Sequence, residues 1–189
     1  LQRHLRALGY LRAGIDGAFG QGTEDAIRAL QYDLLHNDGQ DEHGGPNAPV
    51  RMIDYNRGRI AQVTGVADAD TVACMQDILQ DPGFVFLPFS ESPRDANARI
   101  HERIAEMTSD QAPIPILLAI LEQESNAMHF YTPRGNDEDN YIVVGFDHND
   151  TEAPHRITSR GYGAGQYTLF HHPPRQEEVE QFMLETNGN

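Results

Sequence analysis

The sequence of 189 residues contains a single cysteine, Cys74, and no tryptophan. One cysteine excludes an internal disulfide framework and a zinc site built from several cysteines. Because Cys74 lies among Val72, Met75 and Ile78, we predict that it is a small buried core residue. The apolar share of 39% is enough for cores of modest size, in one large domain or two small ones.

Basic residues are scarce: 14 stand against 29 acidic residues, which gives a net charge of −15. Such a charge disfavours a nucleic acid as partner, because the phosphate backbone is itself negative. It disfavours an acidic membrane surface for the same reason.

Long apolar runs are also lacking, so no segment is predicted to span a membrane. No charged start followed by an apolar stretch marks a secretory signal. Leu1 already lies inside a helical pattern, however, so we expect the natural amino terminus to precede it. The missing signal therefore does not argue against export.

Apolar residues at helical spacing predict three helices in the first half of the chain. Gly9 is expected to end the first helix in a left-handed conformation, and Thr23 is expected to cap the second after a tight turn at Asp16-Gly17. Pro82-Gly83 ends the third. The predicted buried faces are Leu1, Leu5 and Leu8; Ile27, Leu30 and Leu34; and Val72, Met75 and Leu79. The polar segment 36–59 between the second and third helices is predicted to be a long inserted loop.

The second half is also predicted to be mainly helical. Residues 83–92 form an extended linker, and Ser92 with Pro93 starts a helix that buries Ile100, Ile104 and Met107. Another helix follows Pro113 and Pro115, and a last helix with Val179, Phe182 and Met183 follows Pro173-Pro174. A short strand near 141–146 is the main β signal. The predicted fold class is therefore mainly α, with at most a short β element.

The segment "LQRHLRALGYLRAGIDGAFGQGTEDAIRALQ" resembles the three-helix peptidoglycan-binding domain of bacterial cell-wall enzymes. "GVADADTVACMQDIL" is similar to the third helix of that domain, with its Asp-x-x-Thr opening. The resemblance implies a domain over 1–82 that contains the inserted loop 36–59, and peptidoglycan glycan strands as partner. Tyr10 and Phe19 are the candidate sugar contacts, since aromatic rings can stack on sugars as well as pack inside, and Ile15 and Phe19 are expected to pin the turn to the core.

The helix "ILLAILEQES" carries two glutamates, Glu122 and Glu124. At about 100° per residue, Glu124 extends the apolar stripe of Leu117, Leu118, Ile120 and Leu121, whereas Glu122 points away from it. A carboxylate on an apolar face loses hydration, which favours its protonated form and suits a general acid. On geometry alone a paired structural role is equally open. Glu122 is predicted to be solvated.

The sequence around Glu124 resembles a known catalytic helix. "AILEQESNA" is similar to the helix of lysozyme-like muramidases and lytic transglycosylases, and "SRGYGAGQYT" is similar to the glycine-aromatic segment of goose-type lysozymes. The resemblance implies a lysozyme-like domain over 93–189, short enough that we expect it to be incomplete at its carboxyl end. It implies that Glu124 is the acid and that Ser125 orients it. Gly163, Gln166 and Tyr167 would line the substrate groove.

This sequence departs from the goose-type pattern after Gln166, where Tyr167 and Thr168 leave no second carboxylate. Acidic residues of the interval between the two motifs are candidates to replace it, namely Asp137, Glu138, Asp139, Asp147 and Asp150. A second acid with room for a water allows hydrolysis with inversion. Without one, the N-acetyl group of the substrate assists and the product is an anhydro sugar.

Two other functions stay open. Six histidines after residue 100 invite a metal-dependent peptidase or amidase, but none has a compact ligand spacing, and we predict no metal and no cofactor. A non-catalytic wall-binding adaptor would explain the missing second acid. The leading hypothesis is a glycosidase for the bond between N-acetylmuramic acid and N-acetylglucosamine. It would be periplasmic, or secreted or delivered to the bacterial cell wall, and the negative charge favours the thin Gram-negative wall.

Overall fold

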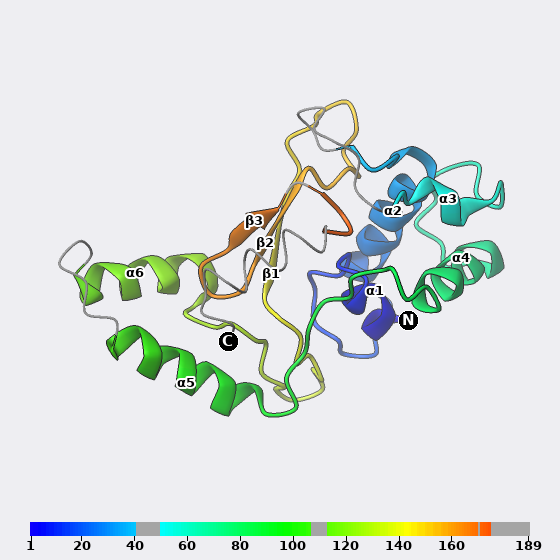
Figure 1. Ribbon diagram of the computed structural model, residues 1–189. Coiled ribbons are helices and arrows are strands. Elements are labelled where there is room, and N and C mark those ends of the chain that lie inside the picture. Colours follow the sequence, from blue (N-terminus) through cyan, green and yellow to red (C-terminus); the bar gives the residue numbers. More distant parts are fainter. Residues whose placement is uncertain (41–49, 107–112, 170, 175–189) are drawn as a thin grey trace.

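The computed structural model describes residues 1–40, 50–106, 113–169 and 171–174. Six helices and three strands occur in these residues (Figure 1). The helices are α1 (Gln2–Ala7), α2 (Gln21–His36), α3 (Ile53–Asn56), α4 (Ala69–Leu79), α5 (Pro93–Glu106) and α6 (Ile114–Ser125). The strands are β1 (Val144–Asp147), β2 (Ser159–Tyr162) and β3 (Tyr167–Leu169). The predicted fold class, mainly α with a short β element, is confirmed.

The short helix α1 ends as the sequence predicts. Leu5 and Leu8 are fully buried, and Gly9 takes the left-handed conformation with φ +79°. The Tyr10 amide then donates to the Leu5 carbonyl, which ties the chain back onto the helix after the turn. Glycine is suited to this position because a side chain is strained at positive φ.

Helix α2 starts earlier than predicted. Its N-cap is Gly20, whose extended backbone brings the Gly20 carbonyl to the amides of Thr23 and Glu24, so Thr23 is not the cap. Instead Thr23 is buried, and its hydroxyl accepts a hydrogen bond from the Gln2 side chain at 3.1 Å. The hydroxyl therefore joins α2 to α1. The predicted buried face of Ile27, Leu30 and Leu34 is confirmed.

The inserted segment is not only a surface loop. Residues 41–49 lie outside the described part of the chain, but the helix α3 follows them, and Met52 and Tyr55 enter the core. The Asp68 side chain then accepts from the Thr71 amide at 2.8 Å, which confirms the predicted Asp-x-x-Thr opening of α4. Cys74 on α4 is fully buried, as predicted.

The antiparallel sheet, in the order β1-β2-β3, packs against the amino-terminal helices (Figure 1). Val144 and Tyr162 belong to the same buried apolar cluster as Leu5 and Leu30. The predicted linker also contributes, because Phe84 and Leu87 are buried and the Leu87 amide donates to the Ala7 carbonyl at 2.8 Å. One core is therefore shared by helices α1 to α4, the linker and the sheet.

Helices α5 and α6 lie on the side of the sheet away from α1–α4 (Figure 1). Helix α5 begins at Pro93, as predicted, and a second small core joins Ile104 to Leu121, Ala127 and Ala164. The predicted burial of the α6 stripe is wrong for Leu118 and Ile120, which are 37% and 51% exposed. The predicted last helix, with Val179, Phe182 and Met183, and Met107 of the α5 face lie outside the described residues.

Candidate functional site

Ser125, the last residue of α6, connects the two segments that carry the lysozyme-like resemblance. Its buried hydroxyl lies 2.8 Å from the carbonyl oxygen of Ala164, which is 39 positions further along the chain. The carbonyl of Leu121, one turn earlier in the helix, is 3.1 Å away. One hydroxyl proton serves one of these acceptors, and Ala164 is the closer. The family resemblance implied that Ser125 orients Glu124. In the structure its hydroxyl instead anchors α6 to the β2–β3 turn.

The chain leaves α6 through two consecutive left-handed residues. Asn126 and Ala127 both have φ +53°, and their amides donate to the carbonyls of Glu122 and Leu121. A left-handed conformation costs a residue with a side chain about 1–2 kcal/mol, and this cost must be offset by the surroundings. His101 of α5 contributes to the offset, since its Nε2 lies 2.6 Å from the Ala127 carbonyl.

The turn between β2 and β3 packs tightly against His129. Gly163 has φ +69°, and a Cβ atom at this position would lie 2.5 Å from the His129 ring. The Ala164 amide donates to Nδ1 of His129 at 3.3 Å, so this nitrogen is the unprotonated one. Burial lowers the pKa of His129 below 6.5, which agrees with a neutral ring. Gly163 therefore has a structural reason to be glycine, whether or not it contacts substrate.

Gln166 folds back onto the turn that it ends. Its φ is +48°, and its side-chain amide donates to the Gly163 carbonyl at 2.8 Å. A Cβ atom at Gly161 would lie 2.9 Å from the Gln166 side-chain oxygen, and one at Gly145 would be closer still. The glycines thus make room for the glutamine. Tyr167 is half-buried and pairs with Tyr162 across the sheet.

The two glutamates of α6 differ less than the sequence predicts. Glu122 is exposed, as predicted, but Glu124 is exposed as well. The expectation of a poorly hydrated Glu124 is therefore wrong in the described structure. The reason is that no described element covers the α6 face that bears Ile120, so this face faces solvent although its residues are apolar.

The candidates for a second acid do not gather beside Glu124. Asp147 is paired with Ser159 at the end of the sheet opposite the Gly163 turn, and it accepts from the Ser159 hydroxyl at 2.5 Å. Asp150 lies beyond it and pairs with Arg156 at 3.3 Å. Asp137 accepts from the Ile15 amide at 3.0 Å, which holds it against the amino-terminal turn.

Asp139 is the most buried of the acidic candidates, and no sequence pattern indicates its partner. It forms an ion pair with Arg6 of α1, and both side chains are almost fully buried. The guanidinium group of Arg6 also lies over the Tyr131 ring, 4.6 Å from its centroid, and donates to the Ala13 carbonyl at 2.8 Å. Asp139 therefore holds the amino-terminal unit against residues 131–139.

The two predicted sugar contacts of the amino-terminal unit have different surroundings. Tyr10 is only 1% exposed, and its hydroxyl donates to the buried Asp33 carboxyl at 2.6 Å. Tyr10 is therefore a core residue and cannot stack on a sugar in this structure. Phe19 is 59% exposed, so it does not pin the turn to the core as the sequence suggested. Its role as a sugar contact stays a prediction, whereas Ile15 is buried as expected.

Residues 1–34 match the family described as "Putative peptidoglycan binding domain". The match covers α1, the glycine-rich turn and most of α2. No curated protein and no solved structure matches the chain. The family match supports peptidoglycan as a partner and association with the cell wall.

Two further findings bear on the other predicted functions. None of the helices in the described ranges is long and apolar enough to cross a membrane. Among the residues that the structure describes, no three His, Cys, Asp or Glu side chains lie close enough together to hold a metal ion.

Proposed function

We propose that this chain is a bacterial cell-wall glycosidase that cleaves the β-1,4 bond between N-acetylmuramic acid and N-acetylglucosamine. In this proposal the amino-terminal unit holds the protein on peptidoglycan and Glu124 protonates the leaving oxygen. Tethering to the polymer raises the local concentration of substrate at the second site. The observation that carries the proposal is the hydrogen bond from Ser125 to Ala164, because it joins the glutamate-bearing helix end to the glycine-rich turn.

The arrangement at this helix end suits a reaction on a long polymer. Glu124 is exposed and lies in the last turn of α6, which is anchored through Ser125, so its backbone is held while its carboxyl stays accessible. A glycan lying over the carboxyl would displace water and favour the protonated form at the moment of reaction. The groove residues proposed beside it are Gly163, Gln166 and Tyr167.

The sugar whose bond to the leaving oxygen is broken can react in two ways. Asp137, Asp147 and Asp150 are each held by other groups, at the amino-terminal turn or at the far end of the sheet. If one of them moves to the substrate, a water can be activated and the bond is hydrolysed. If none does, the N-acetyl group assists and an anhydro sugar forms.

The experiment compares the two glutamates of the same helix. Purified sacculi are incubated with the unchanged chain, with Glu124→Gln and with Glu122→Gln, and the released soluble fragments are measured by mass spectrometry. Loss of the general acid should slow release by about 100-fold or more. Glu122→Gln is the matched control and should release fragments at the original rate. The hydrolysed and anhydro products differ by the mass of one water, which identifies the route.

A second candidate is a non-catalytic wall-binding adaptor. It is favoured by the exposure of Glu124 and by the apolar α6 face, which none of the described elements covers. The same assay separates the two functions. If the unchanged chain sediments with sacculi but releases no fragments, the adaptor function holds and the glycosidase is excluded. Release that is lost on adding a chelator, and not on Glu124→Gln, would support the metal-dependent peptidase instead.

A further inference from the structure

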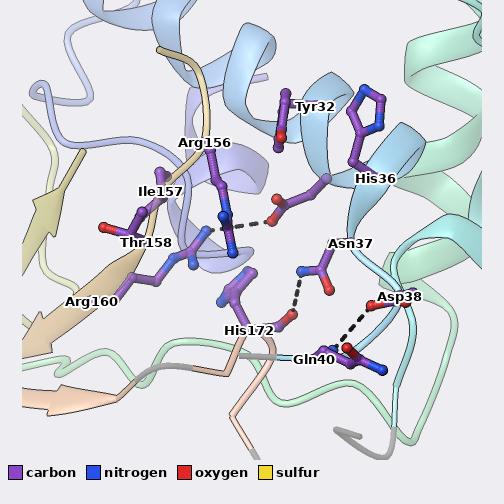
Figure 2. A pocket seen from close by; sticks show the side chains of 11 residues that line it. Tyr32, His36, Asn37, Asp38, Gln40, Arg156, Ile157, Thr158, Arg160 and His172 are labelled. Atoms are coloured by element: carbon purple, nitrogen blue, oxygen red, sulfur yellow. Dashed lines mark hydrogen bonds and ion pairs between the residues drawn. The ribbon is translucent and has the colours of Figure 1, made fainter. Parts of the chain in front are cut away.

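A polar hollow of about 280 Å³ lies where the end of α2 meets the segment before β2 (Figure 2). One wall comes from the peptidoglycan-binding unit and its extension, with Tyr32, His36 and Gln40. The opposite wall comes from Arg156 and Arg160. The hollow thus combines residues of the matched family region with residues far outside it.

The floor of this hollow is fixed by buried polar contacts. Arg160 donates through Nε to the Gly9 carbonyl at 3.0 Å, and its Nη2 lies 3.7 Å from the Asp33 carboxyl (Figure 2). The Asn37 side chain donates to the His172 carbonyl at 3.0 Å and accepts from the Gly39 amide. These residues hold the shape, while the side chains at the rim stay available to a ligand.

One buried hydrogen-bond donor in this floor has no acceptor among the described residues. Nη2 of Arg160 is buried, and its 3.7 Å contact with the Asp33 carboxyl is an ion pair too long for a hydrogen bond, so this donor has no hydrogen-bond partner in the described part of the chain. Buried donors in native structures nearly always have a partner, so an unused one points to an acceptor that is added from outside, such as a water or a ligand atom. In Figure 2 the Arg160 side chain points in among the other lining residues.

The charges of the hollow favour a neutral ligand. Two guanidinium groups, Arg156 and Arg160, face two carboxylates of the same lining, Asp33 and Asp38. Arg156 is also paired with Asp150 at 3.3 Å. Because the positive charges are already balanced, and the whole chain carries −15, a free anion gains little here.

The rim suits the face of a sugar ring. Tyr32 and His36 lie side by side with ring centroids 4.6 Å apart, Tyr32 half-buried and His36 exposed. Aromatic rings bind the apolar face of a sugar, and their polar tips reach its hydroxyls. Arg156 and the side chain of Gln40 add planar hydrogen-bonding groups around them. The volume of about 280 Å³ lies just below the usual range of ligand pockets, which run from about 300 to 1,000 Å³, so one sugar ring fits better than two.

We infer that this hollow binds a single N-acetylated sugar of the peptidoglycan glycan strand. The inference deepens the wall-binding part of the proposed function and rests on it, but it does not require Glu124 to be catalytic. The site would hold one sugar of the strand where the matched family region meets the rest of the chain.

The test is a titration of the chain with the soluble trimer of N-acetylglucosamine, followed by calorimetry. The variant His36→Ala/Gln40→Ala removes two exposed rim side chains, and its matched control His4→Ala/Gln76→Ala removes the same types from exposed positions elsewhere. We expect the rim variant to weaken binding by about tenfold, as the loss of one or two hydrogen bonds of ordinary strength implies. The control should bind as the unchanged chain does.

A neighbouring groove of about 470 Å³, lined among others by Arg12, Asp25 and Phe146, provides the competing site. If Arg12→Ala weakens binding and the rim variant does not, the sugar lies in that groove and the inference is overturned. The absence of saturable binding by the unchanged chain at millimolar trimer also overturns it. Tighter binding of a free stem peptide, lost in the rim variant, overturns the sugar assignment.

Glu124→Gln separates this inference from the proposed reaction. The titration is repeated in a Glu124→Gln background, where no bond is cleaved, and there the rim variant should still weaken trimer binding about tenfold relative to its matched control. Failure of the glycosidase proposal would then show as absent fragment release with intact sugar binding. If the present inference fails, the rim variant will bind the trimer as tightly as the unchanged chain does. It will also release fragments from sacculi at the same rate.

Discussion

Arg6 and Asp139 form an ion pair between α1 and the loop before β1, and their side chains are 0% and 2% exposed. The pair joins α1, which lies in the region that matches the family model, to the segment that leads into the sheet. Arg160 makes a second such link, from β2 to the Gly9 carbonyl. The orientation of the two halves is therefore fixed by buried polar contacts as well as by the shared apolar core.

Removing one partner of the buried pair should be costly. Arg6→Met leaves the Asp139 carboxylate buried without its cation, and breaking buried pairs in this way costs about 3–5 kcal/mol. The measurement is the free energy of unfolding in urea. Arg103→Ala breaks the exposed pair with Glu106, which is worth less than about 1 kcal/mol, and is the control. Equal losses in the two variants would contradict the role given to Arg6. If Arg6→Met does not fold, Asp139→Asn tests the same pair with less change in shape.

Gly163→Ala should disturb the turn that receives Ser125. A side chain at positive φ costs about 1–2 kcal/mol, and the added Cβ would in addition meet the His129 ring at 2.5 Å. Gly135→Ala is the matched control, because Gly135 has φ +61° with open space around its Cβ position. We expect Gly163→Ala to lower the melting temperature more than Gly135→Ala and to slow fragment release from sacculi. Indistinguishable melting curves would show that the His129 contact relaxes freely.

The buried ring of His172 should make stability depend on pH. Burial, and after it the charge of Arg160, lowers the pKa of His172 well below 6.5. Below pH 6.5 the unfolded chain therefore binds a proton that the folded chain does not, and stability falls as the pH falls, by up to about 1.4 kcal/mol per pH unit.

His172→Phe provides the comparison for this pH dependence. The variant removes the titrating group while it keeps an aromatic ring beside Tyr10 and Phe84. In urea unfolding, the unchanged chain should lose more stability than His172→Phe when the pH is lowered through 6.5. Above pH 6.5 the difference between the two should be constant, since only packing then separates them. Parallel curves over the whole range would contradict a neutral buried His172.

The N-cap of α4, Asp68, should also make stability depend on pH, but here the titrating group is an acid and the effect is smaller. Asp68→Ala should cost about 1 kcal/mol at neutral pH, and Asp68→Asn, which keeps an accepting oxygen, should cost much less. The hydrogen bonds from the Thr71 backbone and side chain lower the pKa of Asp68 below 3.8. The advantage over alanine is therefore complete above pH 3.8 and is lost as the pH falls through the lower folded value. The measurement is urea unfolding of the unchanged chain, Asp68→Ala and Asp68→Asn, at neutral pH and at a pH well below 3.8.

Local sequence patterns determined much of the helical framework. Gly9 ends α1, Asp68 caps α4 and Pro93 begins α5, because each acts through the backbone of its own turn. The family match over residues 1–34 reflects the same local information. The prediction that Thr23 caps α2 is wrong, because the Gly20 carbonyl accepts the first amides of the helix instead. The Thr23 hydroxyl therefore accepts a hydrogen bond from Gln2.

Contacts between distant residues were decided only by the tertiary structure. Apolar spacing placed Glu124 on the α6 stripe, but whether that stripe is buried depends on which element lies against it, and among the described residues Ile120 has no such cover. The burial of Tyr10 depends on Asp33 and that of Asp139 on Arg6, partners that no periodicity indicates. Helix periods specify which side chains share a face; the packing of the whole chain specifies which face water reaches.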